Sequence, residues 1–330
     1  MLRFGVMSSA KIGCEHLVPA IQQAGNAKLV AVASRDAKKA KSMAERFNVP
    51  IAYDSYESLL ESTEVDAVYI PLPTSQHIEW TLKAIKAGKH VLCEKPISLK
   101  ATEINKLIKA RDAATANLIV SEAFMVTYHP QWIKVKELLA KNTIGSLRKI
   151  ESSFSYFNKD PKNMRNRPEL GGGALPDIGV YPTVCARFAT GLEPIGATAS
   201  VEFDPVFKTD RYASATLDFP GVEMSFYVST QMANRQTMVF HGDKGFIELS
   251  APFNSNLYEG DEVRVHNANH SDTRVYRFTG INQYRYEIEA FARAATGKKQ
   301  AYFTLEDSIL NQKVIDAIYK SGKSGKRVKV

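Results

Sequence analysis

Residues 2–13 read Leu2-Arg3-Phe4-Gly5-Val6-Met7-Ser8-Ser9-Ala10-Lys11-Ile12-Gly13. The apolar run 2–7 predicts a buried strand, and the apolar spacing over 11–24 predicts a helix directly after it. Dinucleotide-binding folds carry their G-x-G-x-x-G turn at this place and bind pyrophosphate on the helix N-terminus. Here the three positions are Ser8, Ala10 and Gly13, and small residues let a phosphate approach the backbone. The alternative is a plain strand-to-helix turn.

The alternation of strands and helices continues to about residue 122. The predicted strands cover 2–7, 28–33, 66–70, 90–93 and 118–120, and the predicted helices cover 11–24, 36–47, 75–87 and 99–114. Buried strands alternating with helices indicate βαβ units, with a parallel sheet and helices on both of its faces. We therefore expect an α/β, Rossmann-type dinucleotide-binding domain over residues 1–122.

The periodicity changes to two after about residue 146. Ile150 and Phe154 alternate with polar residues, and Pro220-Gly221 separates two alternating runs, which is a hairpin signal. The predicted strands cover 150–157, 213–219, 222–228, 237–240, 246–249, 263–266 and 275–278, and the predicted helices cover 131–141, 178–190, 284–295 and 305–320. We expect an α+β domain over residues 123–330, with an open, mostly antiparallel sheet and helices on one side.

The second face of that sheet carries Tyr, Phe and Ser, so it is wide and semi-polar. An uncovered sheet face is a candidate interface, and we expect a homodimer or homotetramer formed through it. Simple solvation of this face is the alternative. We assign substrate binding as well as oligomerisation to this second domain.

The charge favours a small anionic ligand over nucleic acid. The chain of 330 residues has 43 Lys and Arg against 35 Asp and Glu, a net charge of +8. These cations are scattered and form no run of five, whereas nucleic-acid binders more often show a basic block or stripe. We expect a phosphate-bearing small molecule as the ligand and no nucleic acid.

The cysteines indicate a reducing compartment. Cys14, Cys93 and Cys185 lie far apart and form no CxxC pair, which argues against a disulfide framework. No apolar stretch approaches the roughly 20 residues that span a bilayer, and the N-terminus becomes polar too early for a secretory signal. We expect a cytoplasmic protein with no membrane association. His266 and His270 lack a neighbouring carboxylate cluster, so we expect no metal site.

The end of the second strand predicts the cofactor. NAD enzymes place an acidic residue here to accept the ribose 2′-hydroxyl, whereas this chain has Ser34-Arg35-Asp36. A hydroxyl beside a guanidinium suits a 2′-phosphate, which guanidinium binds in a bidentate way. Asp36 is interpreted as the N-cap of the next helix, although it could instead be the NAD-type acid. The prediction is NADP(H), with NAD(H) possible.

Several motifs resemble those of a known family. They are Pro73 with His77, Glu94-Lys95-Pro96, Glu122-Ala123-Phe124, His129-Pro130-Gln131-Trp132 and residues 168–182. In order and spacing they resemble the glucose–fructose oxidoreductase / inositol dehydrogenase (Gfo/Idh/MocA) family along essentially the whole chain. The resemblance implies a Rossmann domain, a C-terminal α/β domain with an open sheet, and a cis Lys95–Pro96 bond. It also implies hydride exchange between NAD(P) and a carbohydrate-like alcohol.

Within that family, Asp177 followed by Tyr181 is similar to one branch. This branch holds dimeric dihydrodiol dehydrogenases and NADP-dependent D-xylose 1-dehydrogenases. The chain departs from the pattern at Ser8 and Ala10, which replace glycines, at Thr74, which replaces Asn, and at Val126-Thr127, which replaces an aromatic-Arg pair.

The chemistry assigns roles to three catalytic residues. Oxidation of a hydroxyl needs a base, and Tyr with an ordinary pKa of about 10 is a poor one near neutrality. A nearby ammonium stabilises the phenolate, so we expect Tyr181 as acid/base and Lys95 as its electrostatic partner. Asp177 is expected to orient substrate hydroxyls or to hold Lys95. The alternatives are a packed aromatic for Tyr181 and an N-cap for Asp177.

Open α/β sheets bind ligands at the carboxyl ends of their strands, where many of the candidates fall. The predicted cofactor-binding residues are Ser8, Ser9, Ala10, Lys11, Ile12, Ser34, Arg35, Pro71, Pro73, His77, Glu94, Lys95 and Glu122. The predicted substrate-binding residues are Lys95, His129, Arg165, Asp177 and Tyr181. For His77 we favour a role as anchor of the turn. For His129 a structural role, and for Arg165 and Arg167 a solvated loop, are the alternatives.

The sequence therefore predicts an NADP(H)-dependent oxidoreductase acting on a sugar, a sugar derivative or a cyclic diol. The alternative is a non-catalytic NADP-binding redox sensor on the same scaffold. The altered glycine turn and the missing aromatic-Arg pair favour this alternative.

Overall fold

The computed structural model describes residues 1–257 and 260–330, which fold into two compact units. Unit 1 comprises Met1–Met125 and Asn282–Ile309, and unit 2 comprises Val126–Ile281 and Leu310–Val330. The sequence placed the whole of 123–330 in one domain, whereas the structure returns 282–309 to unit 1. The reason is helix α8 (Gln283–Ala295), whose Phe291 ring packs 5.7 Å from that of Phe4 in the unit 1 core.

Unit 1 is built on a parallel sheet, as predicted. Its strands are β1 (Leu2–Met7), β2 (Ala27–Ala33), β3 (Ile51–Tyr53), β4 (Ala67–Ile70), β5 (His90–Glu94) and β6 (Val120–Ala123). In the described part of the chain they form one six-stranded sheet in the order β3-β2-β1-β4-β5-β6. The order reverses between β1 and β4, which is where doubly wound sheets bind dinucleotides.

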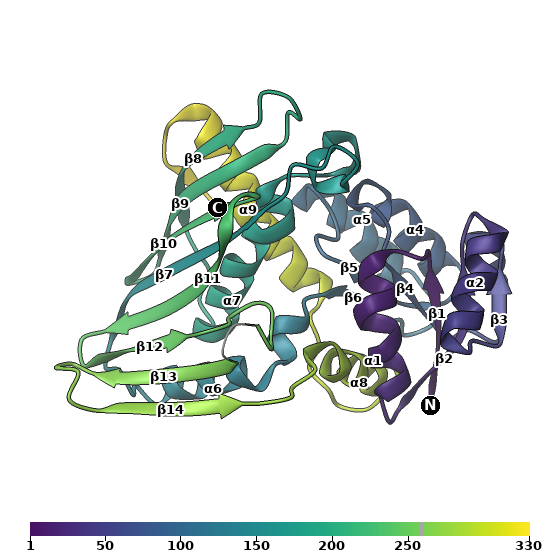
Figure 1. The fold of residues 1–330 in the computed structure, drawn as a ribbon, viewed down its shortest axis with the longest axis horizontal. Coiled ribbons are helices and arrows are strands. Elements are labelled where there is room, and N and C mark those ends of the chain that lie inside the picture. The colour runs from purple at the N-terminus through teal and green to yellow at the C-terminus, as the bar shows by residue number, and fades with distance from the viewer. Residues whose placement is uncertain (258–259) are drawn as a thin grey trace. The chain divides into compact units, whose positions relative to one another are not determined.

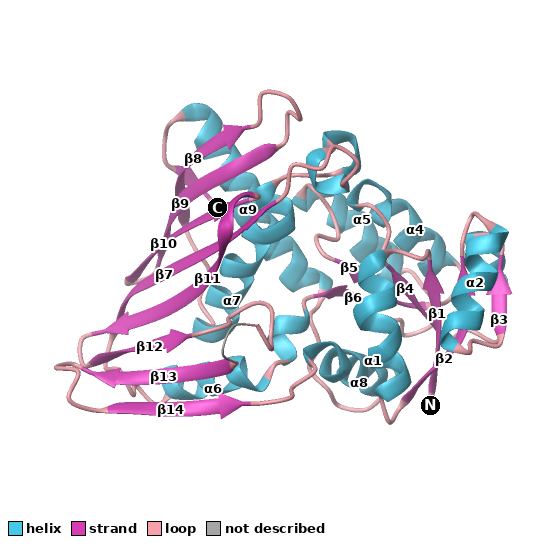
Figure 2. Cartoon of the chain, in the orientation of Figure 1, coloured by secondary structure: helices cyan, strands magenta, loops and turns pink. Residues whose placement is uncertain are grey.

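Helices cover both faces of this sheet (Figure 2). They are η1 (Gly13–Leu17), α1 (Val18–Gln23), α2 (Ala37–Phe47), α3 (Tyr56–Glu61), α4 (Thr74–Lys86), α5 (Ala101–Asp112) and α8. One apolar core joins Phe4, Tyr69 and Leu92 to α1 and α8, and the other joins Val68 and Val91 to α3, α4 and α5. Burial on both faces explains why the strands read as continuous apolar runs.

Unit 2 contains the larger sheet. Its strands are β7 (Leu147–Phe157), β8 (Gly196–Phe203), β9 (Asp210–Phe219), β10 (Val222–Ser229), β11 (Gln231–Gly242), β12 (Gly245–Leu249), β13 (Asp261–Asn267), β14 (Thr273–Phe278) and β15 (Val328–Lys329). Over the described ranges they form a nine-stranded sheet in the order β14-β13-β12-β11-β7-β10-β9-β8-β15. β7 and β10 pair in parallel and the other pairs are antiparallel, which confirms the predicted mostly antiparallel sheet.

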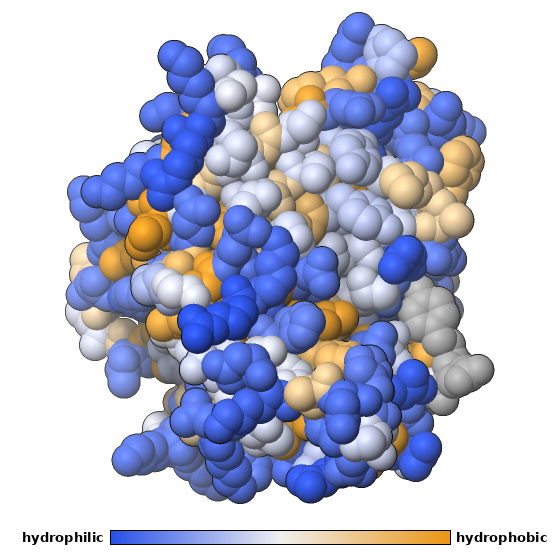
Figure 3. All heavy atoms as spheres, turned by 90° about the vertical axis from the view of Figure 1, so that its left-hand side faces the viewer, coloured by the Kyte–Doolittle hydropathy of each residue, from blue (hydrophilic) through white to orange (hydrophobic). Residues whose placement is uncertain are grey.

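One face of the large sheet carries helices (Figure 1). The helical segments are η2 (Met125–Tyr128), α6 (Pro130–Ala140), η3 (Met164–Asn166), η4 (Pro168–Leu170), η5 (Leu175–Gly179), α7 (Val180–Thr190) and α9 (Leu305–Ser324), which begins in unit 1. Among the described residues no helix covers the opposite face, where pale, near-neutral side chains adjoin hydrophilic and hydrophobic patches (Figure 3). This arrangement confirms the predicted open sheet.

In the described ranges, none of the helices combines the length and the apolar character that a membrane span requires.

Candidate active site

The turn after β1 is closed by the side chain of Ser8. Ser8 has a positive φ of 77°, a backbone conformation that normally favours glycine. Its N–H donates to the carbonyl of Ala33 at the end of β2 (2.7 Å), and its Oγ accepts from the N–H of Ala10 (3.3 Å) and donates to the carbonyl of Pro71 (3.4 Å). The hydroxyl therefore ties the turn to the segment that follows β4.

The helix follows this turn at once. Ser9 and Lys11 are exposed, while Ala10 and Ile12 are half-buried. The first N–H groups of a helix have no partner within the helix and carry a partial positive charge, so they suit an anionic group. The predicted cofactor residues of this segment thus lie at the carboxyl edge of the sheet, in the arrangement that binds a pyrophosphate.

The end of β2 presents Arg35 on the surface. Ser34 is buried, and its Oγ accepts from the N–H of Asp36 (3.2 Å). Asp36 is the N-cap of α2, accepting from the N–H groups of Lys38 (3.0 Å) and Lys39 (3.2 Å), which confirms that interpretation. The Asp36 carboxylate is therefore used to cap α2.

Sequence reasoning missed Tyr56, which lies beside Arg35. Burial raises the pKa of Tyr56, while the charge of the neighbouring Arg35 guanidinium and a hydrogen bond to it act in the opposite direction. The Tyr56 ring packs edge-on against Trp80, with 5.0 Å between ring centroids. A firmly packed phenol therefore places the guanidinium at the strand end. A Ser hydroxyl and a guanidinium at this strand end form a donor set that suits an anionic group.

Lys95 follows β5 directly, and the Lys95–Pro96 peptide bond is cis, as the resemblance implies. Two buried side chains hold its loop. His77 of α4 contacts the carbonyls of Pro96 through Nδ1 (2.8 Å) and of Leu72 through Nε2 (2.7 Å). Glu122 of β6 accepts from the N–H of Ile97 (2.9 Å). The position of Lys95 is thus determined by three neighbouring strand ends.

These contacts revise two of the predicted cofactor residues. His77 is 1% exposed and bridges two loops, which agrees with the anchoring role favoured from the sequence. Glu122 is 4% exposed and also supports the loop rather than facing a ligand. Burial raises the pKa of Glu122 to about 7, although hydrogen bonds from Ser308 and Ile97 and the charge of Lys95 favour its ionised form.

The remaining candidates of unit 1 lie at the same edge of the sheet. Glu94 accepts a hydrogen bond from the hydroxyl of the fully buried Tyr69 (2.6 Å). Pro71 is buried and bonds Ser8 through its carbonyl, and Pro73 is the residue before α4. The structure thus brings the phosphate turn after β1 and the loop of Lys95 after β5 to the same edge of the sheet, on either side of β4.

In unit 2, Asp177 lies in the first turn of a continuous helix formed by η5 and α7. Its Oδ2 accepts from the hydroxyl of Tyr156 (2.6 Å) and from Nε of Arg165 (2.7 Å). The carboxylate side chain is 12% exposed and that of Arg165 is 42% exposed. The interpretation of Asp177 as an N-cap is wrong, because the helix begins two residues earlier, at Leu175.

Asp210 of β9 holds the start of this helix instead. Its Oδ2 accepts from the N–H of Leu175 (2.7 Å) and its Oδ1 from the hydroxyl of Tyr319 in α9 (2.6 Å). A Cβ at Gly173 would lie 2.0 Å from Oδ1 of Asp210, so only glycine fits there. Burial raises the pKa of Asp210 to about 6. Asp210 therefore fixes the helix that carries Asp177 and Tyr181.

Tyr181 is 5% exposed and packs among aromatic rings. Its ring centroid lies 5.7 Å from that of Phe154 and 5.8 Å from that of Phe253, and these two rings stack on one another. The packing agrees with the interpretation of a packed aromatic and also holds the ring rigidly, as an acid/base residue requires. Unit 2 thus brings Tyr181, Asp177 and Arg165 together.

His129 does not fit the predicted contact with substrate. It is fully buried, its Nδ1 accepts from the N–H of Gln131 (3.1 Å) and its Nε2 contacts Asp261 (3.1 Å). His129 is the N-cap of α6, so both ring nitrogens are occupied within the fold. The alternative of a structural histidine replaces the substrate role.

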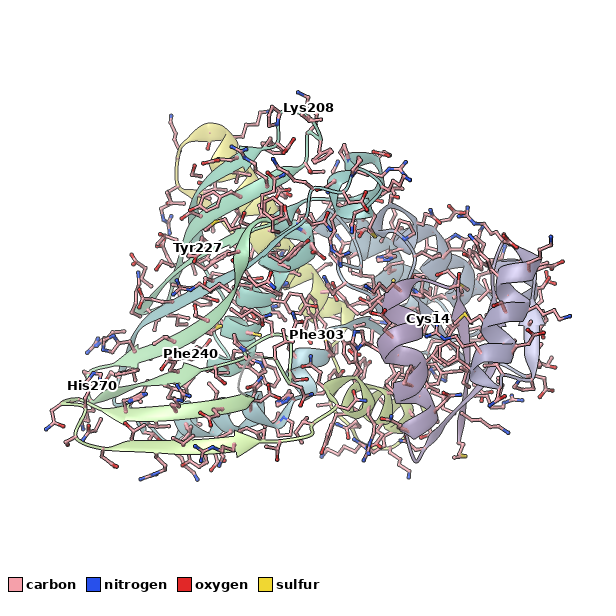
Figure 4. The ribbon with its side chains drawn as sticks, viewed as in Figure 1. Cys14, Lys208, Tyr227, Phe240, His270 and Phe303 are labelled. Atoms are coloured by element: carbon pink, nitrogen blue, oxygen red, sulfur yellow. The ribbon has the colours of Figure 1, made fainter. Side chains whose placement is uncertain are left out.

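Two further features carry no site. Arg167 pairs with Glu169 on the surface (2.7 Å), whereas Arg165 pairs with Asp177. His270 lies at the tip of the β13–β14 hairpin (Figure 4), 5.8 Å from His266 between ring centroids. Across residues 1–257 and 260–330, no group of three His, Cys, Asp or Glu residues is arranged to hold a metal ion.

Sequence reasoning also missed Tyr156 and Asp210. Tyr156 continues the alternation of Ile150 and Phe154 on the inner face of β7, which is a signal for its direction but not for its partner. Asp210 offers no sequence signal, because its partners Leu175 and Tyr319 are 35 and 109 residues away.

A doubly wound sheet with a phosphate turn, followed by a second domain with an open sheet, is typical of dinucleotide-dependent oxidoreductases. Comparison with protein families agrees. Residues 2–123 match the Gfo/Idh/MocA oxidoreductase family with its NAD-binding Rossmann fold, and residues 132–248 match the C-terminal domain of the same family. The chain belongs to the Gfo/Idh/MocA oxidoreductase family, which confirms the resemblance and shows it to be an oxidoreductase.

Two curated relatives fall in the branch expected from the sequence. The NADP⁺-dependent D-xylose 1-dehydrogenase 2 of Haloferax volcanii is 34% identical, with all of both chains covered. The trans-1,2-dihydrobenzene-1,2-diol dehydrogenase of Xenopus tropicalis is 32% identical, with 75% of this chain and 74% of the relative covered.

A solved structure is similar along nearly the whole chain. KijD10, a 3-ketoreductase from Actinomadura kijaniata in complex with NADP and TDP-benzene, is 29% identical, with a TM-score of 0.88 and 97% of both chains covered. The fold of both units therefore occurs in a protein that binds NADP.

Proposed function

We propose that this protein transfers a hydride between NADP and a CH–OH or C=O carbon of a sugar, a sugar derivative or a cyclic diol. NADP, when bound, supplies the acceptor or donor of the hydride. In the oxidative direction Tyr181 takes the hydroxyl proton of the substrate, and in the reductive direction it returns a proton to the carbonyl oxygen. Proton and hydride leave the same CH–OH group, so the oxidation is balanced.

The other residues prepare Tyr181 and the substrate. Lys95 supplies the ammonium that stabilises the phenolate form of Tyr181. Arg165 and Asp177 orient the hydroxyl groups of the substrate. His77 and Glu122 keep the loop of Lys95 in place through hydrogen bonds to its backbone. The observation that carries the proposal is that each unit rigidly holds one half of this chemistry: Lys95 directly after β5, and Asp177-x-x-x-Tyr181 on one helix.

The relatives support the substrate class. Their names cover an aldose dehydrogenase, a cyclic diol dehydrogenase and a 3-ketoreductase. All three chemistries interconvert a CH–OH and a C=O group on a polyoxygenated ring or chain, which is the class proposed here.

The test is a spectrophotometric screen of aldoses, polyols, cyclic diols and dicarbonyls with NADP(H) and NAD(H). On a substrate found in this way, Lys95→Ala is expected to lower turnover at least about a hundredfold, or about 2.7 kcal/mol of transition-state stabilisation. Wild-type turnover of Lys95→Ala would contradict the proposal. Binding of NADPH without turnover of any compound in the panel would favour the redox sensor instead.

The preference for NADP is proposed from the end of β2. Arg35→Ala removes a guanidinium that the packed Tyr56 places beside Ser34, so it is expected to weaken NADPH binding tenfold or more and NADH binding little. Lys28→Ala, an exposed cation at the other end of β2, is the matched control. Calorimetric titration measures both, and an equal loss for the two cofactors would contradict the 2′-phosphate role.

We also propose that the open face of the large sheet forms a homodimer or homotetramer. Ser153 and Ser155 lie on this face with Tyr212 and Tyr227, whose rings stack with 6.3 Å between centroids. Analytical ultracentrifugation of Tyr227→Glu against the wild type tests this proposal, and an unchanged sedimentation coefficient would contradict it.

None of the cysteines, all of which are described, forms a disulfide, which agrees with the proposed cytoplasmic location.

A further inference from the structure

The carboxylate of Asp177 is close to Tyr181 and largely shielded from water. The two residues are four apart across the junction of η5, a π-helical turn, with α7, so they lie within about one helical turn of each other. Only 12% of the Asp177 side chain is exposed. A buried negative charge at this distance disfavours a second negative charge, so an uncompensated Asp177 would oppose formation of the Tyr181 phenolate.

Arg165 lies on the other side of that carboxylate. Its Nε donates to Oδ2 of Asp177 at 2.7 Å, and the hydroxyl of Tyr156 donates to the same oxygen at 2.6 Å. The pKa of Arg165 is raised chiefly by the charge of Asp177, with smaller contributions from the phenols of Tyr156 and Tyr181. The guanidinium is therefore within electrostatic range of Tyr181 as well.

We propose that Arg165, a positioning residue, neutralises Asp177 and thereby keeps Tyr181 able to exchange protons near neutrality. This inference rests on the proposed function in that Tyr181 is the acid/base. It assigns Asp177 a role that the sequence did not suggest: its charge is matched within unit 2 by Arg165, and Tyr156 fixes the pair by a hydrogen bond.

Among the described residues of unit 2, titratable groups on several elements interact at this position. They are Arg165 of η3, Tyr156 of β7, Asp177 of the helix itself and, beyond Tyr156, Asp210 of β9. Asp210 is held by Leu175 and Tyr319 and is left unchanged in every variant below. Lys95, which the proposed function adds from unit 1, is also unchanged, so its effect is constant.

The experiment measures the ionisation of Tyr181 directly. The protein is labelled with 3-fluorotyrosine, which titrates at lower pH than tyrosine, and the Tyr181 signal in ¹⁹F spectra is assigned with Tyr181→Phe. In Arg165→Gln the charge of Asp177 is no longer offset by this guanidinium, which should raise the apparent pKa of Tyr181 by about one unit or more. In Asp177→Asn the uncompensated Arg165 should lower it, and the double variant should titrate close to the wild type.

Opposite signs distinguish an electrostatic role from a structural one, because a distorted site would shift both single variants in the same way. Arg165→Lys keeps the charge and should restore the wild-type titration. Arg167→Gln removes a nearby exposed arginine and is the matched control, expected to leave Tyr181 unchanged. Shifts in one direction for both single variants, or no shift in Arg165→Gln, would overturn the inference.

The readout needs no substrate, so the two proposals fail separately. If the titrations follow the expected signs but Tyr181→Phe retains full turnover, the proposed function fails and the charge relation stands. If Tyr181→Phe loses turnover but the titrations do not change, the inference fails and the proposed function stands.

Discussion

The loop of Lys95 and the helix of Tyr181 are held in different ways. The loop is fixed through its backbone: His77 contacts the carbonyl of Pro96, and Glu122 accepts from the N–H of Ile97. The helix is fixed through charged side chains, since Asp210 binds its first turn and Arg165 binds Asp177. A backbone-held loop positions one charge without adding others, whereas the charged helix adjusts the electrostatic surroundings of Tyr181.

The difference also decides what the sequence could predict. The loop of Lys95 lies at a strand end within a βαβ pattern, so its place followed from the alternation of apolar runs. The network around Tyr181 joins β7, η3, β9 and α9, and its pairings depend on how a mixed sheet is ordered. That order, with the parallel neighbours β7 and β10, is not contained in any local pattern.

The largest expected effect is at Asp210. Asp210→Ala leaves the Leu175 N–H and the Tyr319 hydroxyl without their acceptor, and each unpaired buried donor costs about 1–3 kcal/mol. We expect the free energy of unfolding to fall by about 3 kcal/mol and turnover to fall with it. Asp218→Ala, on the same strand but paired with Arg327 at the surface, should cost less than about 1 kcal/mol. Urea denaturation measures both variants, and equal losses of unfolding free energy would contradict the role of Asp210 in fixing this helix.

The buried carboxyl of Asp210 should also make the free energy of unfolding depend on pH. Folding raises the pKa of Asp210 from 3.8 to about 6, so folding favours its protonated form. The stabilisation is complete below pH 4 and is lost as the pH rises through 6. Relative to Asp210→Asn, which does not titrate, the wild type should lose roughly 2–3 kcal/mol between pH 4 and pH 7. Urea denaturation across this range measures it, and a constant difference would contradict the burial argument.

A smaller effect is expected in the loop of Lys95. Glu122→Ala leaves the buried N–H of Ile97 unpaired and should cost about 2 kcal/mol of unfolding free energy. Glu122→Gln keeps an acceptor oxygen and should cost less than half as much. Thermal and urea unfolding compare the two variants. If both cost the same, the hydrogen bond to Ile97 is not what holds the loop.

Several parts of the fold could not be predicted, for physical reasons. β3 has three residues and β15 has two, too few for a periodicity. β8 has exposed and half-buried residues through most of its length, so its apolar pattern is weak. Helix α8 was predicted as a helix, but its apolar face does not reveal which unit it covers.

The parts of the candidate site that depend on contacts between residues close in sequence could be predicted. Asp36 was interpreted correctly because N-capping is a local relation within three residues. His129 was expected to contact substrate and is instead sealed by Asp261, 132 residues away, a partner that local sequence does not indicate. Tyr56 reaches Arg35 from a short helix that the sequence pattern did not predict.

The most direct test of the account is a double-mutant cycle of Lys95→Met and Tyr181→Phe, measured as kcat/KM on a substrate from the screen. If the ammonium acts through the phenol, the double variant should be about as slow as the slower single variant, because groups that act as a unit are not additive. Losses that multiply in the double variant would show that the two residues act independently and would contradict the mechanism.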